Sequence, residues 1–218
     1  MNNTALFHLK SFKDYYFGTL FRPGRTFDAL LIDRRKLRLG FLAITLNAFL
    51  YTLVYIFLWN RGGAPSSFTP WLNVQKEVYY FYNQFWLAPS MFGCWILAAG
   101  AAHLLSHLFS GKGSFEDTLS VFGFGATIAT LFALFHDLTD SFLGFIGLLD
   151  LRWYEVALNS PTIWRTILWT LYSIALIMLF VLLIKGVAAS QKIKLGPAIF
   201  IGSVAAIMYQ GIFFIFNR

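Results

Sequence analysis

Five long apolar runs dominate the hydrophobic pattern of the chain. They cover residues 39–59, 85–109, 115–135, 163–184 and 196–216. None has a charged residue in its middle; Glu116, Asp117 and Arg165 lie near run ends. A helix needs about 20 mostly apolar residues to cross the hydrocarbon core of a bilayer. The pattern therefore predicts an all-α integral membrane protein with a five-span transmembrane helical bundle over residues 39–217. The shorter apolar patch at 142–149 is interpreted as an interfacial or shallow re-entrant piece.

Residues 1–38 show a different, amphipathic pattern. Apolar side chains recur there at three- and four-residue steps, at Leu6, Leu9, Phe12, Tyr16 and Leu20. This spacing predicts a short helix that lies in the membrane interface. Arg22-Pro23-Gly24-Arg25 predicts a turn, and residues 26–38 a second amphipathic helix. We interpret residues 1–38 as a juxtamembrane segment that carries two amphipathic helices.

The composition agrees with a membrane protein. Apolar residues make up 58% of the chain and charged residues 12%, against about 25% charged residues in an average soluble domain. Too little charge is present to cover a soluble surface, which argues against a soluble enzyme or a nucleic-acid-binding module. Cys94 is the single cysteine, so an internal disulfide is excluded. We expect no cofactor and no nucleic-acid partner.

The cations predict the orientation. With five spans, twelve of the 17 Lys and Arg residues fall on the side of the N-terminus. The positive-inside rule places that side in the cytoplasm, so we expect a multi-pass protein of the cell (inner or cytoplasmic) membrane with a cytoplasmic N-terminus and the C-terminus opposite. Anionic phospholipids are the expected partners of this face. The predicted headgroup contacts are Lys10, Lys13, Arg22, Arg25, Arg34, Arg35, Lys36, Lys112, Lys192 and Lys194.

Three segments carry a family resemblance: Phe21-Arg22-Pro23 with Phe27-Asp28-Ala29-Leu30-Leu31, the span end His103-Leu104-Leu105-Ser106-His107, and the turn Gly111-Lys112-Gly113-Ser114-Phe115. Through them the chain resembles the prokaryotic branch of the Yip family, the Ypt/Rab-interacting membrane proteins, from about Phe12 to Phe216. The resemblance implies a five-span bundle with a cytosolic N-terminus. It also implies a role like that of the eukaryotic members, which are adaptors in vesicle traffic that engage Rab-type GTPases and are associated with membrane shaping.

One candidate metal site can be assembled from the spacing. His103 and His107 are one helical turn apart, which can place two imidazoles on one metal ion. Glu116 and Asp117 open the next span on the same side of the membrane and could complete a cluster. The alternative is that both acids serve the helix N-terminus, because Ser114-Phe115-Glu116-Asp117 is a capping-box pattern.

Rows of small residues predict close helix packing. Span two carries Ser90, Cys94, Ala98 and Ala102 at four-residue steps; span three carries Gly125 and Ala129, and span five Gly202 and Ala206. Such rows let helix backbones approach each other in lipid. Packing within one chain is the first interpretation, and a homo-oligomer face or a lipid-lined groove is the other.

The functional hypothesis follows from what the spans lack. Pumps and ion-coupled transporters carry charged groups inside the membrane, and no such group stands in the middle of these five runs. We therefore expect a non-enzymatic scaffold, adaptor or membrane-organising protein with a possible protein partner. The alternative is a transporter or channel for an uncharged or amphipathic solute or a lipid.

Overall fold

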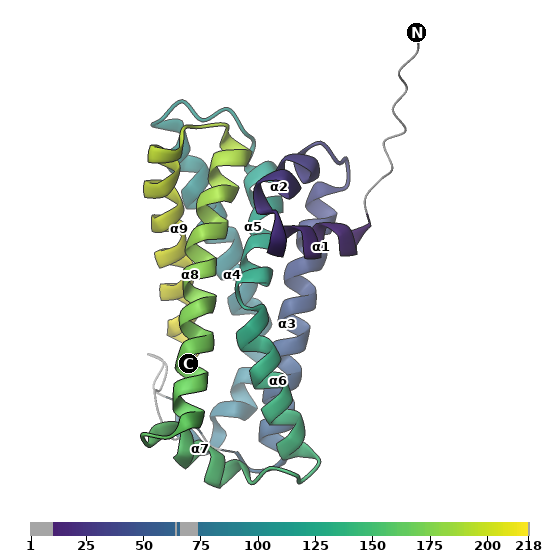
Figure 1. Cartoon of the computed structure of the whole chain (residues 1–218), viewed down its shortest axis with the longest axis vertical. Helices are drawn as coiled ribbons and strands as arrows, with labels where there is room; N and C mark the ends of the chain where they lie inside the picture. The colour runs from purple at the N-terminus through teal and green to yellow at the C-terminus, as the bar shows by residue number, and fades with distance from the viewer. Residues whose placement is uncertain (1–10, 64, 66–73, 218) are drawn as a thin grey trace.

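The long helices run side by side and form a bundle (Figure 1). The computed structural model describes residues 11–63, 65 and 74–217, so Lys10, Leu6 and Leu9 lie outside the described residues. Within the described part, four helices are each long and apolar enough to cross a membrane: α3 (Lys36–Asn60), α4 (Tyr79–His107, preceded by the 3-10 turn η1, Lys76–Val78), α8 (Ile163–Gln191) and α9 (Leu195–Phe216). The other described helices are α1 (Phe12–Phe21), α2 (Pro23–Leu31), α5 (Phe115–Ala129), α6 (Leu131–Phe145) and α7 (Leu151–Asn159).

The third predicted span is a broken helix. α5 and α6 together are apolar enough to cross, and they meet at a bend of 50°. α6 continues from α5 toward the far end of the bundle (Figure 1). The bend falls at Thr130, whose hydroxyl hydrogen-bonds back to the carbonyls of Ala126 and Thr127 and accepts a bond from Asn47 Nδ2 at 3.1 Å. A Thr hydroxyl that bonds to the preceding turn favours such bends.

The structure corrects the sequence prediction in this region. The predicted span ended at residue 135, but the helix continues for ten more residues, to Phe145. The patch at 142–149 is therefore not an independent interfacial piece. Its first half is the last turn of α6, and its second half is a turn in which Gly147 takes φ +81°. Counted as one span, α5 and α6 make the fifth crossing.

Side-chain caps begin α5 and α8, and the one at α5 was predicted from the sequence. The capping box at α5 is confirmed: Ser114 Oγ accepts from Asp117 N at 3.1 Å, and Asp117 Oδ2 accepts from Ser114 N at 3.0 Å. At the start of α8 the cap is Thr162, whose hydroxyl accepts from Arg165 N at 3.4 Å, and Ser160 ends α7.

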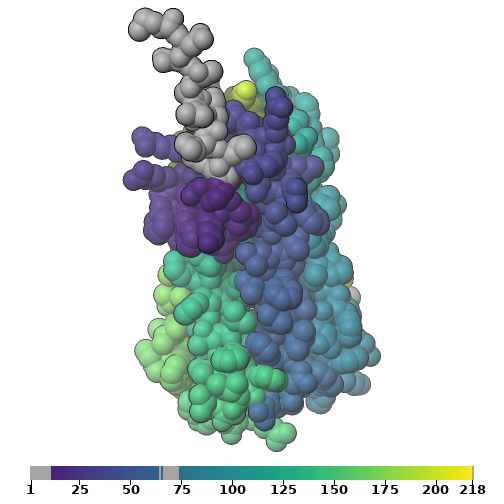
Figure 2. Space-filling view, turned by 90° about the vertical axis from the view of Figure 1, so that its right-hand side faces the viewer, coloured from purple at the N-terminus to yellow at the C-terminus, as the bar shows by residue number. Residues whose placement is uncertain are grey.

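The N-terminal helices pack on the bundle. Phe27 and Leu30 of α2 are fully buried and belong to the same hydrophobic core as the long helices. α2 lies against α5 and α8, and α1 against α5. Figure 2 shows both as a purple protrusion on one side, near one end. The predicted second helix over 26–38 is wrong in its limits: Pro23 starts α2, which stops at Leu31 before α3 begins at Lys36.

All eight residues of the predicted packing rows are buried: Ser90, Cys94, Ala98, Ala102, Gly125, Ala129, Gly202 and Ala206. A Cβ on Gly202 would stand 2.5 Å from Ile184 Cα, so α9 approaches the backbone of α8 at this glycine. The backbones of α3 and α5 also approach closely, at Gly40 and Gly123, which belong to none of the predicted rows. A Cβ on Gly123 would stand 2.4 Å from the carbonyl oxygen of Gly40.

Candidate functional site

Cations gather at one end of the bundle, which we call the basic end. This end carries α1, α2 and the turns at 108–114 and 192–194. Exposed there are Lys13, Arg22, Arg25, Arg34, Arg35, Lys112, Lys192 and Lys194. Lys36 is partly buried, and its ammonium lies 2.5 Å from Asp117 Oδ1, linking α3 to α5. Of the predicted headgroup contacts, Lys36 and Arg35 thus already have carboxylate partners within the chain.

Large apolar side chains stand exposed among these cations. Phe17 and Phe21 of α1 are 56% and 74% exposed, and Ile32, after α2, is 68% exposed. The opposite side of the two helices is packed, with Tyr15, Thr19 and Phe27 buried. The N-terminal pair therefore has one face in the protein core and another that offers aromatic and cationic side chains to its surroundings.

A buried polar network holds the turn between α4 and α5 against the end of α8. The fully buried Gln191 donates from Nε2 to Thr118 Oγ1 at 2.6 Å and to His103 Nδ1 at 3.2 Å. The backbone carbonyl oxygen of Gln191 accepts a hydrogen bond from the backbone N–H of Lys112 at 3.0 Å. A Cβ on Gly113 would stand 1.8 Å from the carbonyl oxygen of Ser190. The glycine in this turn is thus required by a backbone-to-backbone contact.

The predicted metal cluster does not assemble. His103 and His107 do meet, with their Nε2 atoms 3.3 Å apart. Asp117 instead bonds to Lys36 and caps α5, and Glu116 is exposed on the helix surface. Among the described residues no three or more His, Cys, Asp or Glu side chains are placed to hold a metal ion. Capping and the pairing with Lys36 account for the position of Asp117.

Asp33, in the turn between α2 and α3, ties α1 to this turn. Its side chain is 3% exposed; Oδ2 accepts from Arg35 Nη2 at 2.9 Å and from the Tyr15 hydroxyl at 3.1 Å. The hydrogen bonds from Arg35, joined by that from Tyr15, hold the pKa of Asp33 below its usual value. Burial, together with the bond to Asp33, raises the pKa of Tyr15 to about 12.

We expect the docking of α1 to weaken in acid. Because the pKa of Asp33 is lower in the folded state than in the unfolded chain, its contribution to stability is present above about pH 4 and is lost as the pH falls further. A spin-label distance between α1 and α5, followed from neutral pH to pH 3, should lengthen or broaden in that range. Asp33→Asn should already be loosened at neutral pH and should show no further change; the same acid response in Asp33→Asn would contradict this role.

A second polar cluster lies at the other end of the bundle, which we call the opposite end. It consists of His136, Asp137 and Asp140 of α6, Tyr154 of α7 and Tyr172 of α8, and we call it the opposite-end cluster. His136 lies between two carboxylates, with Nδ1 3.1 Å from Asp137 and Nε2 3.1 Å from Asp140. Tyr154 donates to Asp140, and Tyr172 donates to Asp137 at 3.1 Å. An imidazole donates from both nitrogens only when it is protonated.

This cluster revises the picture of uncharged spans. The broken span α5–α6 carries Asp137 and Asp140 in α6, beyond residue 135, where the predicted span ended. The i, i+4 spacing of His136 and Asp140 was a readable signal, because residues four apart share a helix face. Tyr154 and Tyr172 come from other helices, and no local pattern connects them to α6. The cluster links three elements and is suited to hold a proton or to fix their mutual positions.

The comparisons with known proteins bear on the whole of this architecture. A family model described as "Yip1 domain" matches residues 17–216. The chain belongs to the Yip1 domain family. No curated protein and no solved structure matches it.

The match confirms the resemblance inferred from the sequence, and it identifies this Yip1 domain protein as a multi-pass membrane protein. The matched region starts within α1, so it includes α2 and its contacts with the bundle. The glycine turn at 111–113 and the network around Gln191 lie inside it as well. In this Yip1 domain the docked N-terminal helices are therefore part of the same folded unit as the spans.

Proposed function

We propose that this Yip1 domain protein is a non-enzymatic membrane-organising or adaptor component whose N-terminal helices insert into the anionic leaflet at the basic end. The observation that carries the proposal is the exposure of Phe17 and Phe21 beside exposed cations, on helices whose other face is packed in the core. The positive-inside rule supports a cytoplasmic location for this end.

The chemistry of the exposed face fits a lipid interface. Aromatic side chains favour the headgroup level, and cations near an anionic surface each contribute about 1 kcal/mol of attraction. Arg22 and Arg25 flank the start of α2, next to Phe21. Because α1 and α2 are held to the bundle, their insertion would add area to one leaflet beside the spans. Such one-sided insertion favours curved membrane.

The depth of α1 tests the first part of the proposal. Phe21→Cys, labelled with a fluorophore, would be reconstituted with brominated lipids, the native Cys94 being buried. We expect strong quenching in vesicles that contain phosphatidylglycerol and weaker quenching in purely zwitterionic vesicles or in high salt, because salt screens exposed charges. Replacement of Arg22, Arg25 and Arg34 by Gln should reduce the quenching, whereas Arg152→Gln, at the opposite end, should not.

Curvature preference tests the second part. Wild-type protein in a giant vesicle should concentrate in a narrow membrane tube pulled from it, and the double variant Phe17→Ser, Phe21→Ser should distribute evenly. Leu148→Ser is the matched control, because Leu148 is 76% exposed but lies at the opposite end. Equal distribution of the wild type, together with an unquenched label on α1, would refute the proposal.

A further inference from the structure

One face of α8 is buried near the basic end and exposed near the opposite end. Leu183 and Val187 are fully buried. Residues four or seven positions apart lie on the same face of a helix. Toward the N-terminus of α8, the face of Leu183 therefore continues with Leu176, Trp169 and Arg165. These are exposed, Leu176 by 43% and Trp169 by 59%. The first half of α8 thus has an unpacked face that continues the buried one.

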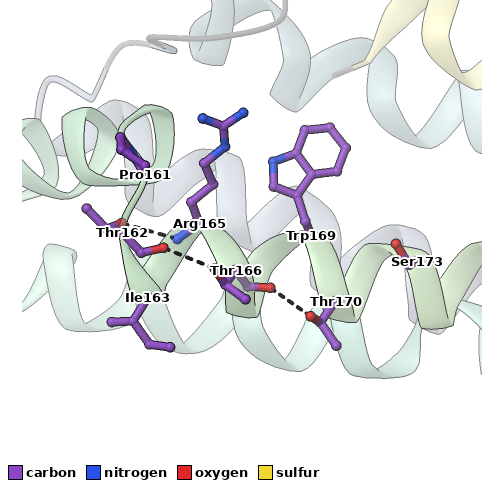
Figure 3. A pocket seen from close by; sticks show the side chains of 8 residues that line it. All are labelled: Pro161, Thr162, Ile163, Arg165, Thr166, Trp169, Thr170 and Ser173. Atoms are coloured by element: carbon purple, nitrogen blue, oxygen red, sulfur yellow. Dashed lines mark hydrogen bonds between the residues drawn. The ribbon is translucent and has the colours of Figure 1, made fainter.

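A groove of about 700 Å³ lies along this unpacked face. Its lining includes Thr162, Arg165, Thr166, Trp169, Thr170 and Ser173, all within four turns of α8. Figure 3 shows the side chains of Arg165 and Trp169 extending from α8 to the same side. Thr166 and Thr170 donate to the carbonyls one turn earlier, at 3.3 and 2.8 Å, so their hydroxyl protons are already used.

The groove runs from headgroup depth into the membrane. Lys185 is the charged residue of α8 nearest the basic end. It lies about 20 residues from Arg165, which is the helix length that crosses the hydrocarbon core. Arg165 therefore lies at the level of the opposite headgroups. At a rise of about 1.5 Å per residue, Trp169 lies about 6 Å deeper and Ser173 about 12 Å deeper. The charged group of the wall, Arg165, lies at its headgroup end, and the exposed apolar Leu176 follows one turn beyond Ser173.

Arg165 supplies the charge that selects a ligand. It is exposed, and among residues 11–63, 65 and 74–217 no acidic side chain forms an ion pair with it. A guanidinium matches a phosphate with two parallel hydrogen bonds. An indole such as that of Trp169 favours the level just below the headgroups.

We propose that this groove binds one phospholipid from the leaflet at the opposite end. The phosphate lies on Arg165, the glycerol region lies beside Thr166 and Trp169, and one acyl chain follows the face of α8 toward Leu176. Thr162, Thr166 and Thr170 stand at four-residue steps on this helix, a spacing that also occurs in contacts with a second transmembrane helix. Such a helix would leave Arg165 without the anionic partner that a phosphate supplies. The site is separate from the N-terminal helices and does not depend on their proposed role.

Lipid retention by the full-length chain tests the proposal. Native mass spectrometry from a mild detergent should show about one bound phospholipid per wild-type chain. After delipidation, phosphatidylglycerol should rebind, whereas diacylglycerol, which lacks the phosphate, should not. Arg165→Gln should weaken rebinding about tenfold, as expected for the loss of a charged hydrogen bond. Arg165→Lys should recover part of the affinity.

Two controls separate binding from folding and from pairing of chains. Arg152→Gln removes another exposed arginine of the same end and should leave lipid binding unchanged, and all variants should keep the unfolding temperature of the wild type. If Arg165→Gln retains phospholipid as well as the wild type, the proposal is wrong. It is equally wrong if Trp169→Cys forms disulfide-linked dimers in vesicles, because the groove would then be a helix–helix interface.

Discussion

Gly123→Ala should destabilise the bundle by about 3 kcal/mol, at the upper end of what overpacking costs. The added methyl group would stand 2.4 Å from the carbonyl oxygen of Gly40 and 2.9 Å from its Cα. These are backbone atoms of α3, so no side-chain rotation relieves the contact and the two helices must separate. The measurement is the free energy of unfolding in mixed micelles, followed by circular dichroism.

Gly93→Ala is the matched control for this substitution. Gly93 also lies inside a long helix, α4, but a Cβ there has no other atom within 4 Å. Alanine is favoured over glycine in a helix by about 1 kcal/mol, so Gly93→Ala should be neutral or stabilising. If both variants shifted stability in the same direction and by the same amount, the contact between α3 and α5 would not be the determinant that the structure indicates.

His136→Leu should also cost about 3 kcal/mol, with a different cause. The substitution removes the ring that lies between Asp137 and Asp140 and leaves two carboxylates in a bent transmembrane span without their common partner. Removal of one member of a buried ionic group is strongly destabilising for this reason. Thermal unfolding in nanodiscs would measure the loss.

The triple variant His136→Leu, Asp137→Asn, Asp140→Asn separates charge from packing. If the uncompensated carboxylates cause the loss, neutral amides should restore most of the stability. If the triple variant is as unstable as His136→Leu, the ring acts through its shape alone, and the electrostatic account of the opposite-end cluster fails. Asp28→Asn, on the exposed side of α2, controls for the general effect of a lost carboxylate.

Hydropathy located the spans well but misjudged the length of the third one. The sequence interpretation ended it at residue 135, because His136, Asp137 and Asp140 follow within one and a half turns. A hydropathy window counts each charge as if it faced lipid. In the structure these groups bond to one another and to Tyr154 and Tyr172, and this pairing allows the helix to continue.

Some glycines at helix contacts can be found from local sequence patterns, and others cannot. Gly125 and Gly202 belong to rows at four-residue steps, which a reader of the sequence can find. Gly40 and Gly123 come together only because α3 and α5 cross where neither has a side chain. The turn at 111–113 is part of the family resemblance, but the need for Gly113 there comes from its contact with the backbone of Ser190, which only the fold creates.

The amino-acid sequence suffices to predict the fold class, the family, the capping box at Ser114 and the gathering of most cations at one end of the bundle. These properties depend on composition, periodicity and short-range spacing. What covers each helix face depends on contacts between distant parts of the chain. These contacts pack α2 on the bundle, give the charged groups of α6 their partners and leave a groove along the first half of α8. An amphipathic pattern shows which side of a helix needs a partner, and the partner itself depends on how distant helices cross.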